Sequence, residues 1–233
     1  MKRRSILKGI GVGSFSLISG QAISQNLTSS LSQPKKAPNY IPNCTFTPEQ
    51  VEGPFYIDTG LVRHDITEGK PGAPLFLNFT VVDTATCAPM RDAVVDIWHA
   101  DAIGYYSGFP EQGKDGNVDT TGEKFLRGTQ ITNPHGQCCF RTIYPGHYTG
   151  RANHIHLKVL LNQSTLVTTQ LYFPDDLTDQ VHQAPPYNKN TERRVRNDED
   201  ILFTEEILLN FKTQKQAYGY EAEFVLGVNT QQS

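Results

Sequence analysis

Short runs of alternating apolar and polar residues constrain the fold of this chain more than any other feature of its sequence. The clearest run has an apolar residue at every second position: Leu75, Leu77, Phe79 and Val81. Side chains two apart in a β-strand lie on the same face, so this period predicts a strand with one buried face. Further strand-like runs cover 93–97, 124–129, 137–143, 152–161, 165–173 and 224–228.

Turn-forming sequences separate these runs, among them Lys-Pro-Gly at 70–72 and Asp-Gly-Asn at 115–117. Many short strands with frequent turns favour an antiparallel sandwich over a βαβ architecture. We therefore predict an all-β fold, an immunoglobulin-like antiparallel β-sandwich with long active-site loops. One segment, 198–212, has a helical character because leucines and isoleucines follow acidic residues, and we predict a short C-terminal helix there.

The first residues of the chain have the features of an export signal. Arg3 and Arg4, followed by Ile-Leu-Lys, resemble a twin-arginine signal. The apolar run 9–20 is too short and too polar to span a bilayer, which takes about 20 apolar residues. We therefore predict a periplasmic or extracellular protein with no membrane attachment after cleavage. Its predicted parts are a signal peptide over 1–24, a flexible leader over 25–43 and one domain over 44–233.

The charge of the chain argues against nucleic acid or an anionic membrane as a partner. Its formal net charge is −3, and removal of the signal would take away four basic residues and no acid, leaving −7. An acidic protein is not attracted electrostatically to phosphate backbones or anionic lipids.

The chain has four cysteines: Cys44, Cys87, Cys138 and Cys139. They are too few and too irregularly spaced for a zinc site, but in an oxidising compartment they can form a disulfide. Adjacent cysteines on a strand point to opposite faces and do not easily pair, so Cys44 with Cys87 is the predicted bond. The alternative is that all four are small buried apolar residues.

Residues that can perform chemistry are concentrated in 148–156, Tyr-Thr-Gly-Arg-Ala-Asn-His-Ile-His. In an extended strand, His154 and His156 would share one face and could bind one metal ion. Tyr148 indicates which metal, because a phenol binds well only as phenolate, and a hard, highly charged cation removes its proton. The pattern favours Fe(III) over zinc.

Three segments together resemble the intradiol ring-cleavage dioxygenases, a family that includes the catechol and protocatechuate dioxygenases. They are 96–107, which contains Gly104-Tyr105-Tyr106, then 144–148, and 151–156. The similar region runs from about 52 to 173, and the chain is most similar to the small exported branch of the family. The resemblance implies that Fe(III) is bound by Tyr106, Tyr148, His154 and His156. Tyr106 matches the family pattern Gly-x-Tyr, and Tyr105 does not.

The resemblance also implies an activity. A catechol would chelate the iron, the tyrosine matching Tyr148 would leave the metal and accept a substrate proton, and O2 would open the ring between its two hydroxylated carbons. The product would be a muconate-type diacid. Arg151 would stabilise carbanion character on the ring, and Gln170 would hydrogen-bond near the iron.

Some alternatives stay open at this point. A zinc or copper protein could use His154 and His156 with His99 or His147, and a non-catalytic sandwich could bind aromatic compounds or carbohydrate. Arg151 could instead bridge a carboxylate at the rim of the sandwich. Taken individually, His99 is expected to be a hydrogen-bonded core residue, and His147 to lie in a pocket wall or at the surface. The preferred catechol, the oligomer and a lid role for 174–200 are left open.

Overall fold

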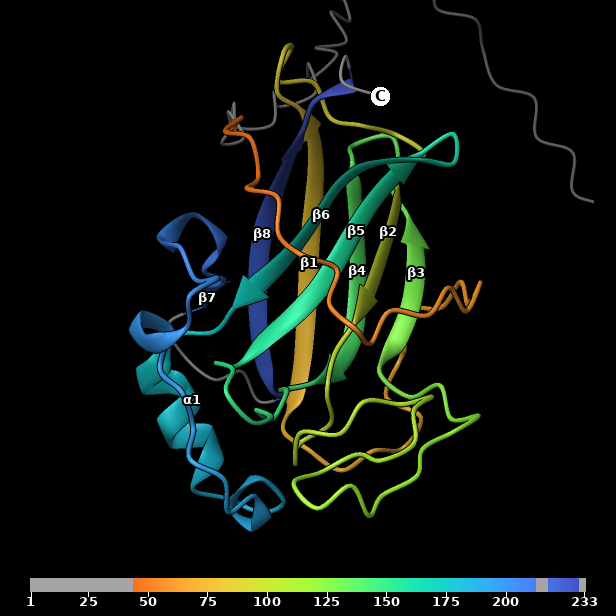
Figure 1. The fold of residues 1–233 in the computed structure, drawn as a ribbon. Helices are drawn as coiled ribbons and strands as arrows, with labels where there is room; N and C mark the ends of the chain where they lie inside the picture. The colour runs from red at the N-terminus through yellow and green to blue at the C-terminus, as the bar shows by residue number, and fades with distance from the viewer. Residues whose placement is uncertain (1–43, 213–217, 231–233) are drawn as a thin grey trace, which may run out of the picture. The chain divides into compact units, whose positions relative to one another are not determined.

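The computed structural model describes residues 44–212 and 218–230. They form a sandwich of two four-stranded sheets (Figure 1). The first sheet has the order β4-β1-β8-β7 and consists of β1 (Pro74–Asp83), β4 (Gln137–Ile143), β7 (Asn210–Phe211) and β8 (Tyr220–Val228). The second has the order β3-β2-β5-β6 and consists of β2 (Val94–Trp98), β3 (Arg127–Ile131), β5 (His154–Leu161) and β6 (Ser164–Tyr172). Neighbouring strands are antiparallel except β1 and β8, which are parallel.

The predicted sandwich is confirmed, and the side chains that the alternation predicts to be buried do form its core. Leu75, Leu77 and Val81 are fully buried and Phe79 is 1% exposed. They join the inner residues of the second sheet in one hydrophobic core. Every predicted strand run coincides with or overlaps a strand, because alternation is a local signal of a half-buried strand. The two-residue strand β7 was not predicted.

The predicted helix over 198–212 is wrong. That region contains the 3-10 turns η2 (Asn197–Glu199) and η3 (Glu205–Ile207) and then β7. Its apolar residues do not share one face, since Ile201 is 96% exposed while Leu209 is buried. The backbone of Leu209 donates to the carbonyl of Tyr172 at the end of β6, so tertiary pairing replaces helical hydrogen bonds.

The α-helix of the described region is α1 (Asp175–His182), and the 3-10 turn η1 (Tyr187–Lys189) follows it. Its first turn carries Asp175 and Asp176 directly after Pro174, which are start signals present in the sequence. Among the described residues, no helix has the length and apolarity needed to cross a bilayer.

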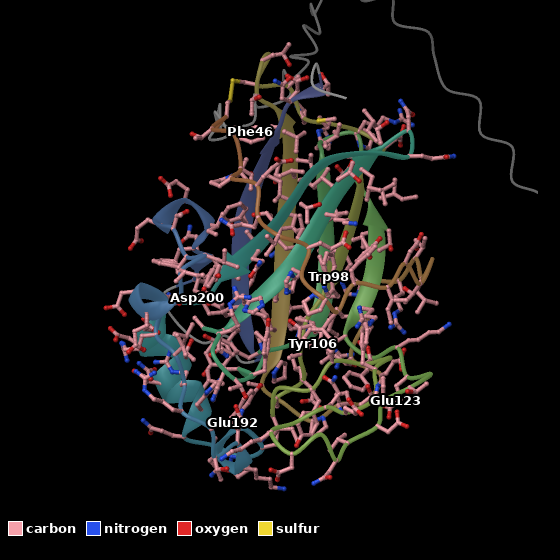
Figure 2. All side chains as sticks on the ribbon, viewed as in Figure 1. Phe46, Trp98, Tyr106, Glu123, Glu192 and Asp200 are labelled. Carbon is pink, nitrogen blue, oxygen red and sulfur yellow. A yellow bond between two sulfur atoms is a disulfide. The ribbon has the colours of Figure 1, made fainter. Side chains whose placement is uncertain are left out.

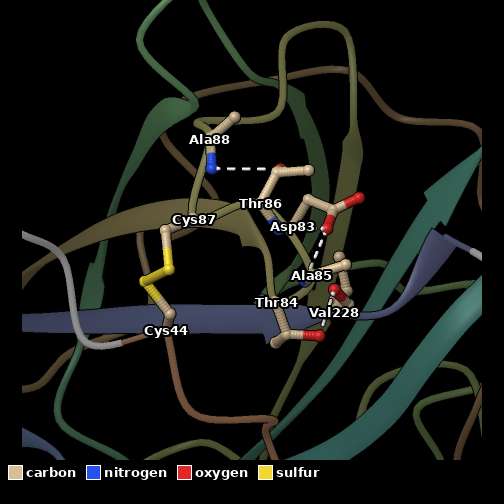
Figure 3. Close-up of a disulfide and its surroundings, with 8 residues drawn as sticks. All are labelled: Cys44, Asp83, Thr84, Ala85, Thr86, Cys87, Ala88 and Val228. Atoms are coloured by element: carbon tan, nitrogen blue, oxygen red, sulfur yellow. Dashed lines mark hydrogen bonds between the residues drawn. A yellow bond between two sulfur atoms is a disulfide. The ribbon is translucent and has the colours of Figure 1, made fainter.

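The Cys44–Cys87 disulfide is present, as predicted (Figure 3). It ties the first described residue to the turn that follows β1. Cys138 is buried and Cys139 is exposed, so the adjacent cysteines do point to opposite faces of β4.

The register of the second sheet determines which strand ends meet. Trp98, the last residue of β2, lies opposite His156, and His154 at the start of β5 lies opposite Tyr172 at the end of β6. The long segments 99–126 and 144–153 leave the sandwich at this end, below the sheets in Figure 1, where α1 also lies. The predicted functional residues are therefore gathered at one end of the sandwich.

Candidate active site

The two histidines lie together on β5, as their spacing predicts. His154 is 3% exposed and His156 is 1% exposed. Their Nε2 atoms are 3.1 Å apart. The ring of Trp98 stacks on His156 with 5.1 Å between centroids and fixes its orientation from β2.

Two tyrosines from separate loops complete a closed group of four rings with the histidines. The Tyr148 ring centroid lies 5.5 Å from that of His154 and 5.6 Å from that of Tyr106. The Tyr106 ring lies 6.2 Å from His156, and the histidine rings are 4.8 Å apart. Tyr106 is fully enclosed near Trp98, at the loop end of the sandwich (Figure 2), while Tyr148 is half-buried. All four predicted ligands therefore lie in one cluster, which we call the Tyr-His cluster.

The donor atoms of the Tyr-His cluster fit a metal ion. His154 Nδ1 lies 2.7 Å from the carbonyl of Ala152, so this nitrogen carries the proton and Nε2 keeps its lone pair. Two nitrogens bound at right angles to one ion, with bonds of about 2.1 Å, would be about 3 Å apart, as the histidine Nε2 atoms are. The buried hydroxyl of Tyr106 makes no hydrogen bond of normal geometry within the described residues, and the Tyr148 hydroxyl is near enough to influence its pKa. Such an unsatisfied polar group costs about 1–3 kcal/mol, which a bound cation would offset.

Burial controls the protonation of these side chains. Burial, followed by the positive charge of Arg151, lowers the pKa of His154 to about 3. Burial likewise lowers the pKa of His156 far below its ordinary value, so both imidazoles are neutral, as metal ligands must be. Burial raises the pKa of Tyr106 and of Tyr148 above the ordinary value. Because both phenols stay protonated on their own, a strongly polarising cation is needed to make them ligands.

Arg151 donates hydrogen bonds to Tyr148 of the Tyr-His cluster and to three side chains around it. Its Nη1 donates to the Tyr148 hydroxyl over 3.3 Å. Its Nη2 donates to Gln170 Oε1 over 2.6 Å and to the Tyr172 hydroxyl over 2.7 Å. Its Nε donates to Asp200 Oδ2 over 2.8 Å. Arg151 thus bridges a carboxylate, which was the alternative considered from sequence, and also contacts a predicted ligand.

Asp200 is a site residue that sequence reasoning missed. Its side chain is 1% exposed, and it also accepts a hydrogen bond from the backbone N–H of Ala152. Nothing in its local sequence distinguishes it from the neighbouring acidic residues, which were interpreted as the start of a helix. Only the path of the chain after α1 brings this carboxylate to Arg151.

The N-terminal segment 51–56 covers the cluster, although its sequence indicated only the start of the family-like region. Phe55 stacks on Tyr106 with 4.3 Å between ring centroids. Gly53 has a φ of +74°, and a Cβ there would lie 3.0 Å from Cε1 of His156. The carbonyl of Val51 accepts a hydrogen bond from Nε2 of the buried Gln170. This segment limits the access of water to the buried side of the cluster.

A cavity of about 150 Å³ opens beside Tyr148. A cavity of roughly this volume accommodates a benzene-sized molecule. Its lining includes Phe55, Tyr105, Glu111, His147, Tyr148 and Glu192. Tyr105 and His147 thus both line this cavity, and Phe109 packs edge-on against Phe55. Tyr148 is the one predicted ligand that reaches this cavity, which we call the substrate pocket.

The other histidines do not complete a zinc or copper site. His99 is fully buried, with Nδ1 2.8 Å from the Ala100 carbonyl and Nε2 2.7 Å from the Thr142 hydroxyl. His147 Nε2 lies 3.1 Å from the carbonyl of Glu192. Within 44–212 and 218–230, no three His, Cys, Asp or Glu side chains are grouped to hold a metal ion. The alternative with a third histidine therefore has no support.

Comparisons with known proteins agree with this fold. The family model described as Dioxygenase matches residues 47–198. A solved structure, the intradiol ring-cleavage dioxygenase from Tetranychus urticae, is 34% identical with a TM-score of 0.74, and the match covers 80% of this chain and 95% of that one. The protocatechuate 3,4-dioxygenase beta chain of Burkholderia cepacia is 30% identical over 72% of this chain and 73% of its own length.

Catechol 1,2-dioxygenase of Acinetobacter baylyi is 31% identical over 56% of this chain, and the match covers 47% of its length. The chain thus spans about half the length of this curated relative. The fold and these matches place the chain in the Dioxygenase class of β-sandwich proteins. Within that class, the chain belongs to the family of the intradiol ring-cleavage dioxygenases.

Proposed function

We propose that this protein is an Fe(III)-dependent intradiol dioxygenase. It would cleave a catechol-type ring with O2 between the two hydroxylated carbons and release a muconate-type diacid. The observation that supports this most directly is the convergence of Tyr106, Tyr148, His154 and His156 beside an aromatic-sized pocket.

In this proposal the Tyr-His cluster holds the iron. Fe(III) would supply Lewis-acid chemistry that polarises a chelated catechol toward oxygen. Tyr106 and the histidines are enclosed, so they act as permanent ligands. Tyr148 is half-buried and reaches the pocket, so it is the ligand that can move aside and accept a proton from a catechol hydroxyl.

Arg151 would serve the reaction as a fixed positive charge. Gln170 and Tyr172 accept hydrogen bonds from its Nη2 and Asp200 from its Nε, which keeps the guanidinium beside the Tyr148 hydroxyl. A charge held in place before the reaction stabilises developing negative charge on the ring without reorganisation. Gln170 would position this guanidinium and close the site through its bond to the Val51 carbonyl.

We also propose that the protein acts outside the cytoplasm. The predicted signal over 1–24 and the leader over 25–43 lie outside the described residues. The Cys44–Cys87 disulfide supports export, because disulfides persist mainly in oxidising compartments. A fusion of residues 1–24 to a reporter should leave the cytoplasm by the twin-arginine route. Substitution of both Arg3 and Arg4 by Lys should retain the reporter, and unchanged export would contradict the assignment.

The activity is tested with a panel of catechols, first without and then with oxygen. Iron-loaded protein should be red-brown from tyrosinate-to-Fe(III) charge transfer, and catechol should shift this band anaerobically. Oxygen should then give a diacid that contains both atoms of isotopically labelled O2. Chelator-treated protein and His154→Ala are the controls. A colourless zinc-loaded protein, an aldehyde product, or binding of aromatics without turnover would contradict the proposal.

A further inference from the structure

We propose that the substrate pocket selects catechols by the charge of their ring substituent, favouring cationic and neutral groups over carboxylates. This inference rests on the proposed function. Two acidic side chains, Glu111 and Glu192, line the pocket beside Tyr148, and none of the described lysines and arginines lines it. A substituent that extends from the bound ring into this space would meet two carboxylates at neutral pH.

Glu192 is fixed in the pocket wall. Its carboxylate accepts a hydrogen bond from the hydroxyl of Thr149, the residue directly after Tyr148. Its backbone N–H donates to Asn190 Oδ1 over 3.0 Å, and the Asn190 amide donates to the carbonyl of His147 over 2.9 Å. The carboxylate is therefore part of the ordered wall next to the predicted mobile ligand.

Positive groups nearby do not cancel this charge. Arg151 is absent from the lining, and the carboxylate of Asp200 already pairs with its guanidinium. Lys114 and Lys189 line an adjoining hollow, but Asp115 and Glu192 line it as well, so that hollow has no excess of positive charge. Over the two hollows together, two lysines stand against Asp115, Glu192 and Glu111, so one negative charge remains in excess, and both lysines lie outside the pocket lining.

A charged substituent and a fixed carboxylate a few ångströms apart interact measurably even at a surface, so selection on the order of tenfold per charge is expected. Protocatechuate is a catechol that carries a carboxylate. A pocket that disfavours carboxylates would therefore differ in substrate preference from the relative named as a protocatechuate 3,4-dioxygenase beta chain. Substituents that donate hydrogen bonds or carry an ammonium group match the acceptor oxygens of the wall.

Three catechols that differ in the charge of one substituent test the inference: 3,4-dihydroxybenzoate, 3,4-dihydroxybenzyl alcohol and 3,4-dihydroxybenzylamine. Assays use the full-length, iron-loaded protein at about pH 8, where an ordinary imidazole is neutral. The kcat/KM for the amine should exceed that for the acid by about a hundredfold, about tenfold for each of the two charges by which they differ, and salt at about 0.5 M should shrink the ratio. Anaerobic calorimetry with iron-loaded and metal-free protein should give the same order of affinities.

The variants Glu192→Gln and Glu111→Gln should each lower the amine-to-acid ratio several-fold. Glutamine keeps an acceptor oxygen for the Thr149 hydroxyl, so Glu192→Gln tests charge and not loss of the contact. Glu206→Gln is the matched control, because this exposed acid lines a different hollow. Equal kcat/KM for the three catechols, or a ratio that the Glu192 and Glu111 variants leave unchanged, overturns the inference. Absence of ring cleavage with every catechol overturns the proposed function instead.

Discussion

The guanidinium of Arg151 and the carboxylate of Asp200 meet across 49 residues of sequence, with 2.8 Å between Nε and Oδ2. The same Arg151 donates to the hydroxyl of Tyr148. The segment that follows α1 is thereby tied to the Tyr-His cluster. Asp200 would thus act as a positioning residue for Arg151, without touching the metal or the substrate itself.

Asp200→Asn should lower kcat more than it changes KM, because Arg151 loses the anion that orients it. Unfolding in urea should become easier by about 1–3 kcal/mol, since a buried pair loses its charge but keeps an acceptor oxygen. Exposed Asp198 provides the control, and Asp198→Asn should have neither effect. If Asp200→Asn alters stability but leaves kcat unchanged, the residue has a structural role only.

The lowered pKa of Asp200 should make the stability of the folded protein depend on pH in acid. Burial by itself would raise the pKa of Asp200, but hydrogen bonds from Ala152, Leu202 and Arg151 outweigh it and lower that pKa below its ordinary range. A carboxyl whose folded pKa is depressed stabilises the protein above its unfolded pKa, about 3.9, and this stabilisation is lost as pH falls through the folded value. The stability difference between wild type and Asp200→Asn should therefore shrink below about pH 4. A difference that stays constant or grows with acid in urea titrations would contradict this.

Tyr106→Phe should have opposite effects in metal-free and iron-loaded protein. Without metal, the change removes a buried hydroxyl that makes no hydrogen bond of normal geometry to the described residues, so the free energy of unfolding should rise by about 1 kcal/mol. With iron, the variant should lose the part of the charge-transfer absorption that Tyr106 contributes, keep the part from Tyr148, and hold the metal less tightly. Tyr144→Phe is the control: its buried hydroxyl lies 2.8 Å from that of Thr178, so removal should cost about 1 kcal/mol. Urea unfolding with and without chelator measures the change in the free energy of unfolding for both variants. A decrease for Tyr106→Phe in metal-free protein would argue against a metal site.

Gly53→Ala should weaken the metal site through His156. The new Cβ would lie 3.0 Å from the imidazole, at a φ of +74° that side chains other than glycine disfavour. Gly60 has a φ of +60°, and a Cβ at this position would have nothing within 4 Å, so Gly60→Ala isolates the backbone effect. Both variants should lose about 1–2 kcal/mol of stability, and only Gly53→Ala should also lower iron affinity. Equal iron affinity in the two variants would show that segment 51–56 shifts to accommodate the new methyl group without disturbing His156.

The Cys44–Cys87 disulfide should contribute about 2–4 kcal/mol to stability, because it closes a loop with a sequence separation of 43. A double variant with serine at both positions should unfold at a correspondingly lower urea concentration, and a reducing agent should bring the wild type to the same point. Cys139→Ser changes an exposed free thiol and should leave the transition where it is. A wild type insensitive to reduction would mean that the bond does not stabilise the fold.

Local sequence was sufficient to predict most strands and half of the Tyr-His cluster. Alternation with a period of two is imposed by the strand itself, so the buried face of β1 and the paired orientation of His154 and His156 could be predicted without knowing their neighbours. The disulfide could be predicted for a similar reason, since the adjacent Cys138 and Cys139 cannot easily bond to each other.

Tertiary structure decided what depends on distant parts of the chain. The resemblance to the family favoured Tyr106 over Tyr105 by its spacing from Gly104, but only packing shows that Tyr106 is enclosed while Tyr105 lines the pocket. The segment 198–212 does not form a helix. Part of it lies beside the end of β6, where the backbone N–H of Leu209 donates to the carbonyl of Tyr172. The salt bridge from Asp200 to Arg151 arises in the same way. The sequence alone thus determined side-chain periodicity and the types of the four candidate ligands. The enclosure of Tyr106 against Phe55 and the contact of Asp200 with Arg151 depended on long-range packing, which no local pattern encodes.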